Sequence, residues 1–136
     1  MPRDLSLDLR RAIVAHLRGT AALTALVPAA KIYGEFATSD EFPFIRMGYA
    51  IVTGYEASCW DGSESDFTID AFAAGPGTAA ISEIAKRIVA AMETFNPATV
   101  GMPEYSWEGT QVIPDVIPEN LHAVIRFRIV AVQEAA

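Results

Sequence analysis

The chain has 136 residues, of which 51% are hydrophobic and 20% are charged, and its formal net charge is -7. These values predict one globular domain over residues 1–136 and exclude a disordered chain. The acidic balance disfavours nucleic acid as a primary partner, because a negative surface repels a phosphate backbone. The single cysteine, Cys59, excludes an internal disulfide and a multi-cysteine metal site. The sequence shows neither the apolar segment of a signal peptide nor about 18 consecutive apolar residues, so we expect no membrane partner.

Two helices are predicted at the start of the chain. The first carries an apolar stripe at four-residue spacing, formed by Leu5, Leu9, Ile13 and Leu17. Such spacing is typical of an amphipathic helix, and Gly19 marks its end. Residues 20–27 then predict a short second helix, which Pro28 stops.

Two antiparallel strands are predicted next. Apolar residues alternate with polar ones over residues 42–51 and again over 66–73. Residues 55–65 break this alternation and contain Asp61-Gly62, a strong turn signal, so we expect a loop of about ten residues between the strands. A weaker apolar segment at residues 32–36 predicts a short strand before them.

The second half of the chain predicts one long helix and two more strands. Residues 78–95 have the clearest helical periodicity. Prolines surround the strand predicted near residues 105–112, which places it near a sheet edge. Residues 120–132 form the longest strand signal, with apolar odd-numbered positions opposite a mixed face. Together the elements predict an α+β fold: a mainly antiparallel four- to five-stranded sheet with two main helices packed on one face.

No motif predicts a catalytic, cofactor-binding or metal-ligating residue, and we expect no cofactor. His16 and His122 lie outside any catalytic pattern, so packed or surface histidines are the better interpretation. Cys59 has no neighbouring base in the sequence that would make it a nucleophile. In residues 61–66 the glycine is misplaced for a calcium loop, and residues 75–78 lack the lysine of a P-loop.

Three side chains are candidates for contact with a partner: Trp60, Arg126 and Arg128. Trp60 adjoins the acidic turn, where a large aromatic residue can anchor an interface. Arg126 and Arg128 share one face of the long strand, which would point away from the helices. Arginine makes bidentate ion pairs and is enriched at interfaces. Solvated arginines that keep the sheet from aggregating remain the alternative.

The order and spacing of these segments resemble a family of small structural proteins: the tail terminator, or tail completion, proteins of long-tailed phages, siphovirus-like prophages and gene transfer agents. The resemblance covers nearly the whole chain and rests on residues 9–18, 21–27, 31–34, 42–48, 75–95 and 126–128. It implies no enzyme activity. It implies a ring, typically a hexamer, that caps the tail tube, stops tail polymerisation and provides the surface on which the head docks.

The same resemblance implies the partners and the location of the protein. The expected partners are other copies of the chain, the tail tube protein and head–tail connector proteins, and DNA passes through the ring without specific binding. The protein is expected in the bacterial cytoplasm during assembly and then at the head–tail junction of the particle. Residues 55–65 and the outer face of the long strand would supply the contact patches. Two alternatives remain: a small α+β ligand-binding domain or enzyme with a pocket between helices and sheet, and a homodimer.

Overall fold

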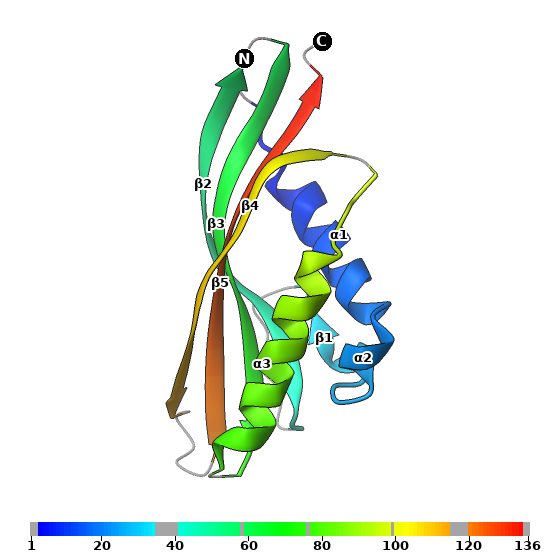
Figure 1. The fold of residues 1–136 in the computed structure, drawn as a ribbon, viewed down its shortest axis with the longest axis vertical. Coiled ribbons are helices and arrows are strands. Elements are labelled where there is room, and N and C mark those ends of the chain that lie inside the picture. The colour runs from blue at the N-terminus through cyan, green and yellow to red at the C-terminus, as the bar shows by residue number, and fades with distance from the viewer. Residues whose placement is uncertain are drawn as a thin grey trace.

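The computed structural model describes residues 3–34, 41–57, 59–75, 77–98, 100–114 and 120–134. One sheet with the strand order β1-β2-β3-β5-β4 has the helices packed on one of its faces (Figure 1). The strands are β1 (Ile32–Tyr33), β2 (Phe44–Ala57), β3 (Trp60–Ala74), β4 (Gly101–Pro114) and β5 (Asn120–Glu134). The helices are α1 (Ser6–Arg18), α2 (Ala21–Thr24) and α3 (Thr78–Glu93), with a 3-10 turn η1 (Ala29–Lys31). The predicted α+β fold is confirmed.

The strand pairing places β5 between β3 and β4. β5 pairs with β3 along its whole length and with β4 from Leu121 to Val132, antiparallel in both cases. β2 pairs antiparallel with β3, whereas the two residues of β1 pair parallel with β2 at Ile45 and Arg46. The longest strand signal of the sequence therefore lies inside the sheet, where it holds two neighbours together.

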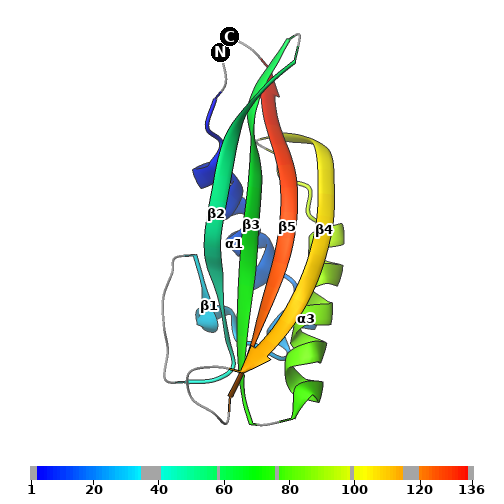
Figure 2. The same ribbon diagram turned by 90° about the vertical axis from the view of Figure 1, so that its left-hand side faces the viewer.

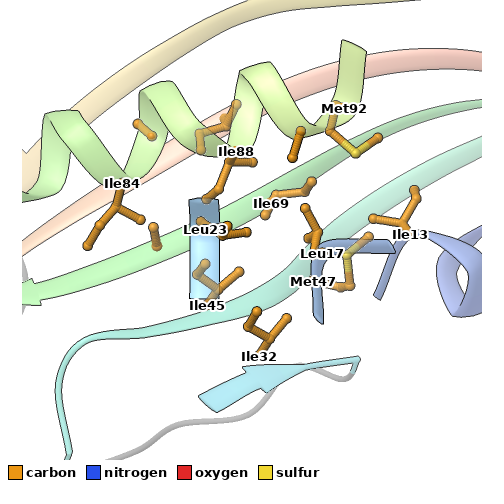
Figure 3. Packing of buried hydrophobic residues seen from close by; sticks show 14 of the residues in the cluster. Ile13, Leu17, Leu23, Ile32, Ile45, Met47, Ile69, Ile84, Ile88 and Met92 are labelled. Atoms are coloured by element: carbon orange, nitrogen blue, oxygen red, sulfur yellow. The ribbon is translucent and has the colours of Figure 1, made fainter. Parts of the chain in front are cut away.

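The hydrophobic core lies between the sheet and the two long helices. The inward residues of β5 include Ile125, Phe127 and Ile129, and all three are buried. In Figure 3, side chains from α1, α2, α3, β1, β2 and β3 converge on one space. Those labelled are Ile13, Leu17, Leu23, Ile32, Ile45, Met47, Ile69, Ile84, Ile88 and Met92. Each fully buried aliphatic side chain of this kind contributes about 1.5–3 kcal/mol relative to an exposed one. The core therefore depends on the alternation in the strands and on the apolar stripe of each helix.

The start of α1 is held by a side-chain contact from the residues before it. The carboxylate Oδ1 of Asp4 accepts a hydrogen bond from the backbone N–H of Ser6 at 2.9 Å. Hydrogen bonds from Ser6 lower the pKa of Asp4, because they favour its charged form. Asp4 thus satisfies one of the N–H groups that a helix leaves unpaired at its first turn.

The edge position predicted for the proline-bearing strand is confirmed. β4 is the last strand of the sheet and contains Pro103 and Pro114, whose missing N–H groups are tolerated at an edge. The pairing with β5 is irregular between Trp107 and Gly109, and Gly109 has φ 140°. β4 is longer than the sequence indicated, since it begins at Gly101.

The predicted ten-residue loop between the first two long strands is wrong. β2 continues to Ala57, β3 begins at Trp60, and Tyr55 lies opposite Gly62 in the ladder. A Cβ on Gly62 would lie 1.9 Å from the carbonyl oxygen of Ala131, so this glycine permits close packing onto β5 and does not form a turn.

The other difference concerns the short strand predicted at residues 32–36. It is present as β1, but only Ile32–Tyr33 pair with β2. Residues 35 and 36 of that prediction lie outside the described residues.

Candidate functional site

The first predicted contact residue, Trp60, lies at the hairpin tip, by which we mean Tyr55, Glu56, Trp60 and Asp61. Trp60 is the first residue of β3 and is 47% exposed. Glu56 and Asp61 lie opposite each other across the two strands, which concentrates negative charge there. In Figures 1 and 2 this end of the hairpin extends beyond α1. The hairpin tip is therefore an exposed, acidic projection with one large aromatic side chain.

Arg126 and Arg128 lie on the outer face of the sheet, the face that the helices leave uncovered (Figure 2). Nη2 of Arg128 donates a hydrogen bond to Glu64 of β3 and lies 3.5 Å from Oε2 of Glu104 on β4. The hydrogen bond with Glu64 raises the pKa of Arg128, and the charge of Glu104 acts in the same direction. Arg126 is exposed and lines a shallow depression of about 270 Å³. The two arginines thus differ: Arg128 joins three strands of its own sheet, whereas Arg126 faces solvent.

Exposed apolar side chains lie beside these arginines on β2. Tyr49 is 54% exposed and Ile51 is 59% exposed, and both line the same depression as Arg126. β1 pairs with β2 only at Ile45 and Arg46, so the rest of this strand borders no further strand within the described residues. Adjacent exposed apolar residues on a water-soluble surface favour an interaction site. The depression combines them with an exposed guanidinium, which is a composition typical of interface centres.

A polar cluster is buried on the same outer face, nearer the other end of the strands. Nε of Arg46 lies 3.5 Å from Oδ2 of Asp70, and Nε2 of His122 lies 3.8 Å from the same oxygen. The rings of Phe44, Phe72 and His122 stack in succession, with centroids 4.4 Å and 4.2 Å apart. Asp70 is only 5% exposed. This group is packed against aromatic rings, which agrees with the interpretation of His122 as a packed histidine.

The second histidine also has a packing role. Nε2 of His16 donates to the carbonyl oxygen of Ala91 at 2.7 Å, and its ring packs on Phe95 at 5.5 Å between centroids. These contacts join the end of α1 to the end of α3. Both histidines therefore agree with the interpretation of packed side chains.

Trp107 lies on the helix side of the edge strand β4. It is 50% exposed, and its Nε1–H donates to Oγ1 of Thr110 at 3.2 Å. Together with Val112 it lines an apolar groove of about 410 Å³ between β4 and α3. Lys86 and Glu93 of α3 border this groove with one charge of each sign.

A basic groove runs along α1, and no pattern in the sequence indicates it as a site. It has a volume of about 420 Å³ and is lined by Leu7, Arg10, Arg11, Val14, Ala15, Arg18 and Gly34. Nε of Arg18 donates to the carbonyl oxygen of Ile32 at 3.0 Å, which closes one end of the groove against β1. In the sequence these arginines are simply the polar side of an amphipathic helix. Their grouping around a hollow depends on where β1 packs, which periodicity does not reveal.

No group of three or more His, Cys, Asp or Glu side chains that could hold a metal ion is found among the described residues. Within the same part of the chain, no helix is long and apolar enough to cross a membrane.

Comparison with known proteins identifies a family and solved structures with a similar fold. A family model described as Tail completion protein gp17 matches residues 11–131. No curated protein matches the chain. A chain in the virion of a native gene transfer agent (GTA) particle has a similar fold, with a TM-score of 0.76 and 17% sequence identity over 92% of this chain and 95% of that one. At this identity the likeness concerns the fold alone, whereas the family match covers most of the sequence.

Proposed function

Because this chain belongs to the Tail completion protein gp17 family, we propose that it is a tail terminator, a structural protein that closes the tail of a phage or a phage-like particle. In this role it forms a ring, a hexamer, on the finished tail tube. The ring stops tail polymerisation and provides the surface on which the head docks. The observation that carries the proposal is the family match over residues 11–131, and the fold shared with a chain of a GTA virion supports it.

The proposed partners are other copies of the chain, the tail tube protein and the head–tail connector proteins. DNA passes through the ring without specific binding, in keeping with the net charge of -7. The protein is made and assembled in the bacterial cytoplasm and then remains at the head–tail junction of the particle.

We assign the contacts of this assembly to the hairpin tip and to the outer face of the sheet. Trp60 supplies a large, exposed aromatic side chain, and Arg126 supplies an exposed guanidinium next to apolar Tyr49 and Ile51. Such residues are enriched among those that carry most of the binding energy of interfaces. Arg128 belongs to the same surface, where its ion pairs with Glu64 and Glu104 hold three strands in register.

The test of the function is deletion of the gene from the phage, prophage or gene transfer agent that encodes it. We expect overlong tails, or separate heads and tails, in electron micrographs of the particles. Complementation with the wild-type gene should restore tails of uniform length. Normal particles with normal tails in the deletion strain would refute the proposal.

The contact residues are tested by complementing the same deletion with variants. Arg126→Glu together with Arg128→Glu should reduce the number of capped tails, whereas Arg87→Glu, a charge reversal on the helix side, should not. Thermal unfolding of each purified variant separates lost contacts from lost folding. Full complementation by the double variant would remove both arginines from the interface.

A further inference from the structure

A closed ring requires two different patches on each copy, because one copy must present what the next copy receives. The hairpin tip is one such patch, since it projects beyond the helices and exposes Trp60 (Figure 1). We infer that the basic groove along α1 is the other patch, so that the hairpin tip of one copy docks into the α1 groove of the next. This inference rests on the proposed ring and names the pair of surfaces that closes it. The outer face with Arg126 and Arg128 is then left for the contacts with the tail tube and connector proteins.

Charge complementarity selects this groove. Arg10, Arg11 and Arg18 line it, which places three of the ten basic residues of an acidic chain around one hollow. Asp8, the one acidic residue in the sequence of α1, is not among the lining residues. Opposite charges on two surfaces steer their encounter and fix their register. The tip brings Glu56 and Asp61 onto adjacent strands, two carboxylates against the one guanidinium of Arg3, which donates to Gln133 beside Asp61, so its net sign is opposite to that of the groove.

The apolar parts of the two surfaces also match. The groove has a volume of about 420 Å³ and contains the exposed side chains of Leu7 and Ala15. This volume lies in the range of hollows that enclose a small organic group. The indole of Trp60 would pack on Leu7 with a guanidinium of Arg10 or Arg11 over its face, which is a favourable cation–π arrangement. A tryptophan in a pocket surrounded by arginines has the composition of an interface hot spot.

Two other surfaces fit the hairpin tip less well. The groove between α3 and β4 is apolar, but Lys86 and Glu93 give it one charge of each sign and hence no preference for an acidic partner. On the outer face, Arg128 is already compensated by Glu64 and Glu104, and the depression at Arg126 is also lined by Asp66 and Glu108.

The native cysteine provides a direct test. Cys59 adjoins Trp60, is exposed and is the only cysteine in the chain. Ala15→Cys places one thiol in the groove at an exposed helical position, so each interface between copies contains one groove thiol and one tip thiol. A short bismaleimide is applied to the full-length protein and to purified tails. We expect a ladder on a denaturing gel that extends from dimers to the full ring.

Matched variants make the ladder specific. Wild-type protein, which has Cys59 alone, and Ala15→Cys with Cys59→Ser each carry one thiol and can give dimers at most. Arg10→Glu with Arg11→Glu in the two-thiol protein should abolish the ladder. Adding Glu56→Lys with Asp61→Lys should restore it, because both surfaces then have reversed charge.

The outcomes separate the docking from the ring itself. A ring seen by native mass spectrometry or on tails, with no cross-linked species beyond the dimer, would overturn the docking and leave the proposed function intact. Absence of any ring from wild-type protein and tails would overturn both. If the arginine variants kept the ladder but lost retention of a double-stranded DNA fragment, the groove would bind DNA and the docking would be wrong.

Discussion

Arg46→Met tests whether the buried cluster on the outer face holds the sheet together. In the wild type, Arg46 lies 3.5 Å from Asp70, and its guanidinium carbon lies 4.8 Å from the centroid of the Phe72 ring. Methionine fills much of the same space but leaves the carboxylate of Asp70, 5% exposed, without its cation. Oδ1 of Asp70 has no hydrogen-bond partner among the described residues, and the basic group that then remains beside the carboxylate is His122, whose Nε2 lies 3.8 Å from Oδ2.

Removing one partner of a buried ion pair costs about 3–5 kcal/mol. A domain of this kind has about 5–15 kcal/mol of stability, so the loss is a large fraction of the whole. With a urea dependence of about 2 kcal/mol per molar, the unfolding midpoint should fall by about 2 M. The assay is equilibrium urea unfolding followed by tryptophan fluorescence.

The double variant Arg46→Met with Asp70→Asn provides the control. Asparagine has nearly the shape of aspartate but no charge, so the double variant should recover about 2 kcal/mol of the loss. An Arg46→Met variant within about 1 kcal/mol of wild type would refute the reasoning, since the pair would then contribute little. A double variant as unstable as the single one would show that the loss comes from packing on Phe72 and not from charge.

Three smaller predictions concern single positions, and each is checked by chemical or thermal unfolding. Tyr105→Phe should stabilise the fold by about 1 kcal/mol, because the Tyr105 hydroxyl is buried without a hydrogen-bond partner among the described residues. Burial also raises the pKa of Tyr105, because it disfavours the ionised form in the fold. The wild-type protein should therefore keep its full stability below the unfolded pKa of about 10 and lose stability as the pH rises from there through the folded pKa, whereas the phenylalanine variant should lack this alkaline loss. Gly62→Ala should lower the free energy of unfolding by about 3 kcal/mol, because the added Cβ would lie 1.9 Å from the carbonyl oxygen of Ala131. Gly77→Ala, where a Cβ meets open space, should lower it by less than about 1 kcal/mol. Equal losses in the two variants would contradict the close approach of Gly62 to Ala131. Asp4→Ala should lower the free energy of unfolding by about 0.5 kcal/mol at pH 7, and since the pKa of Asp4 is lowered in the fold, this difference should vanish as the pH falls through that lowered pKa; a constant difference would exclude the hydrogen bond to Ser6 as its source.

The sequence could predict those strands, helices and edge positions whose residue pattern is compatible with a single local structure. Alternation over residues 120–132 reflects the two faces of β5, and the apolar stripe of α1 reflects the side that meets the sheet. Pro103 and Pro114 indicated an edge because a missing N–H is tolerated only there.

The hairpin was misjudged because small polar residues have more than one use. Ser63 and Ser65 resemble a loop in sequence, yet both are buried in β3. Ser63 accepts a hydrogen bond from the backbone N–H of Leu5 at 3.1 Å, a contact that joins residues far apart in the chain. The close approach of Gly62 to Ala131 likewise depends on strand order, which no local pattern contains.

The surfaces were predictable only in part for the same reason. Exposure of Trp60 and the shared face of Arg126 and Arg128 follow from local position. The partners of Arg128 do not, because Glu64 and Glu104 come within reach only once β3 and β4 pair with β5 in this register.

The place of β5 between β3 and β4 also sets an order of events during synthesis. β2 and β3 can pair as soon as they leave the ribosome, since they are consecutive strands. β4 has no partner until β5 follows it, and the core lacks Ile125, Phe127 and Ile129 for the same period. Until residues 120–134 emerge, the nascent chain exposes an apolar sheet face and two open strand edges. The risk of aggregation is therefore highest during this interval.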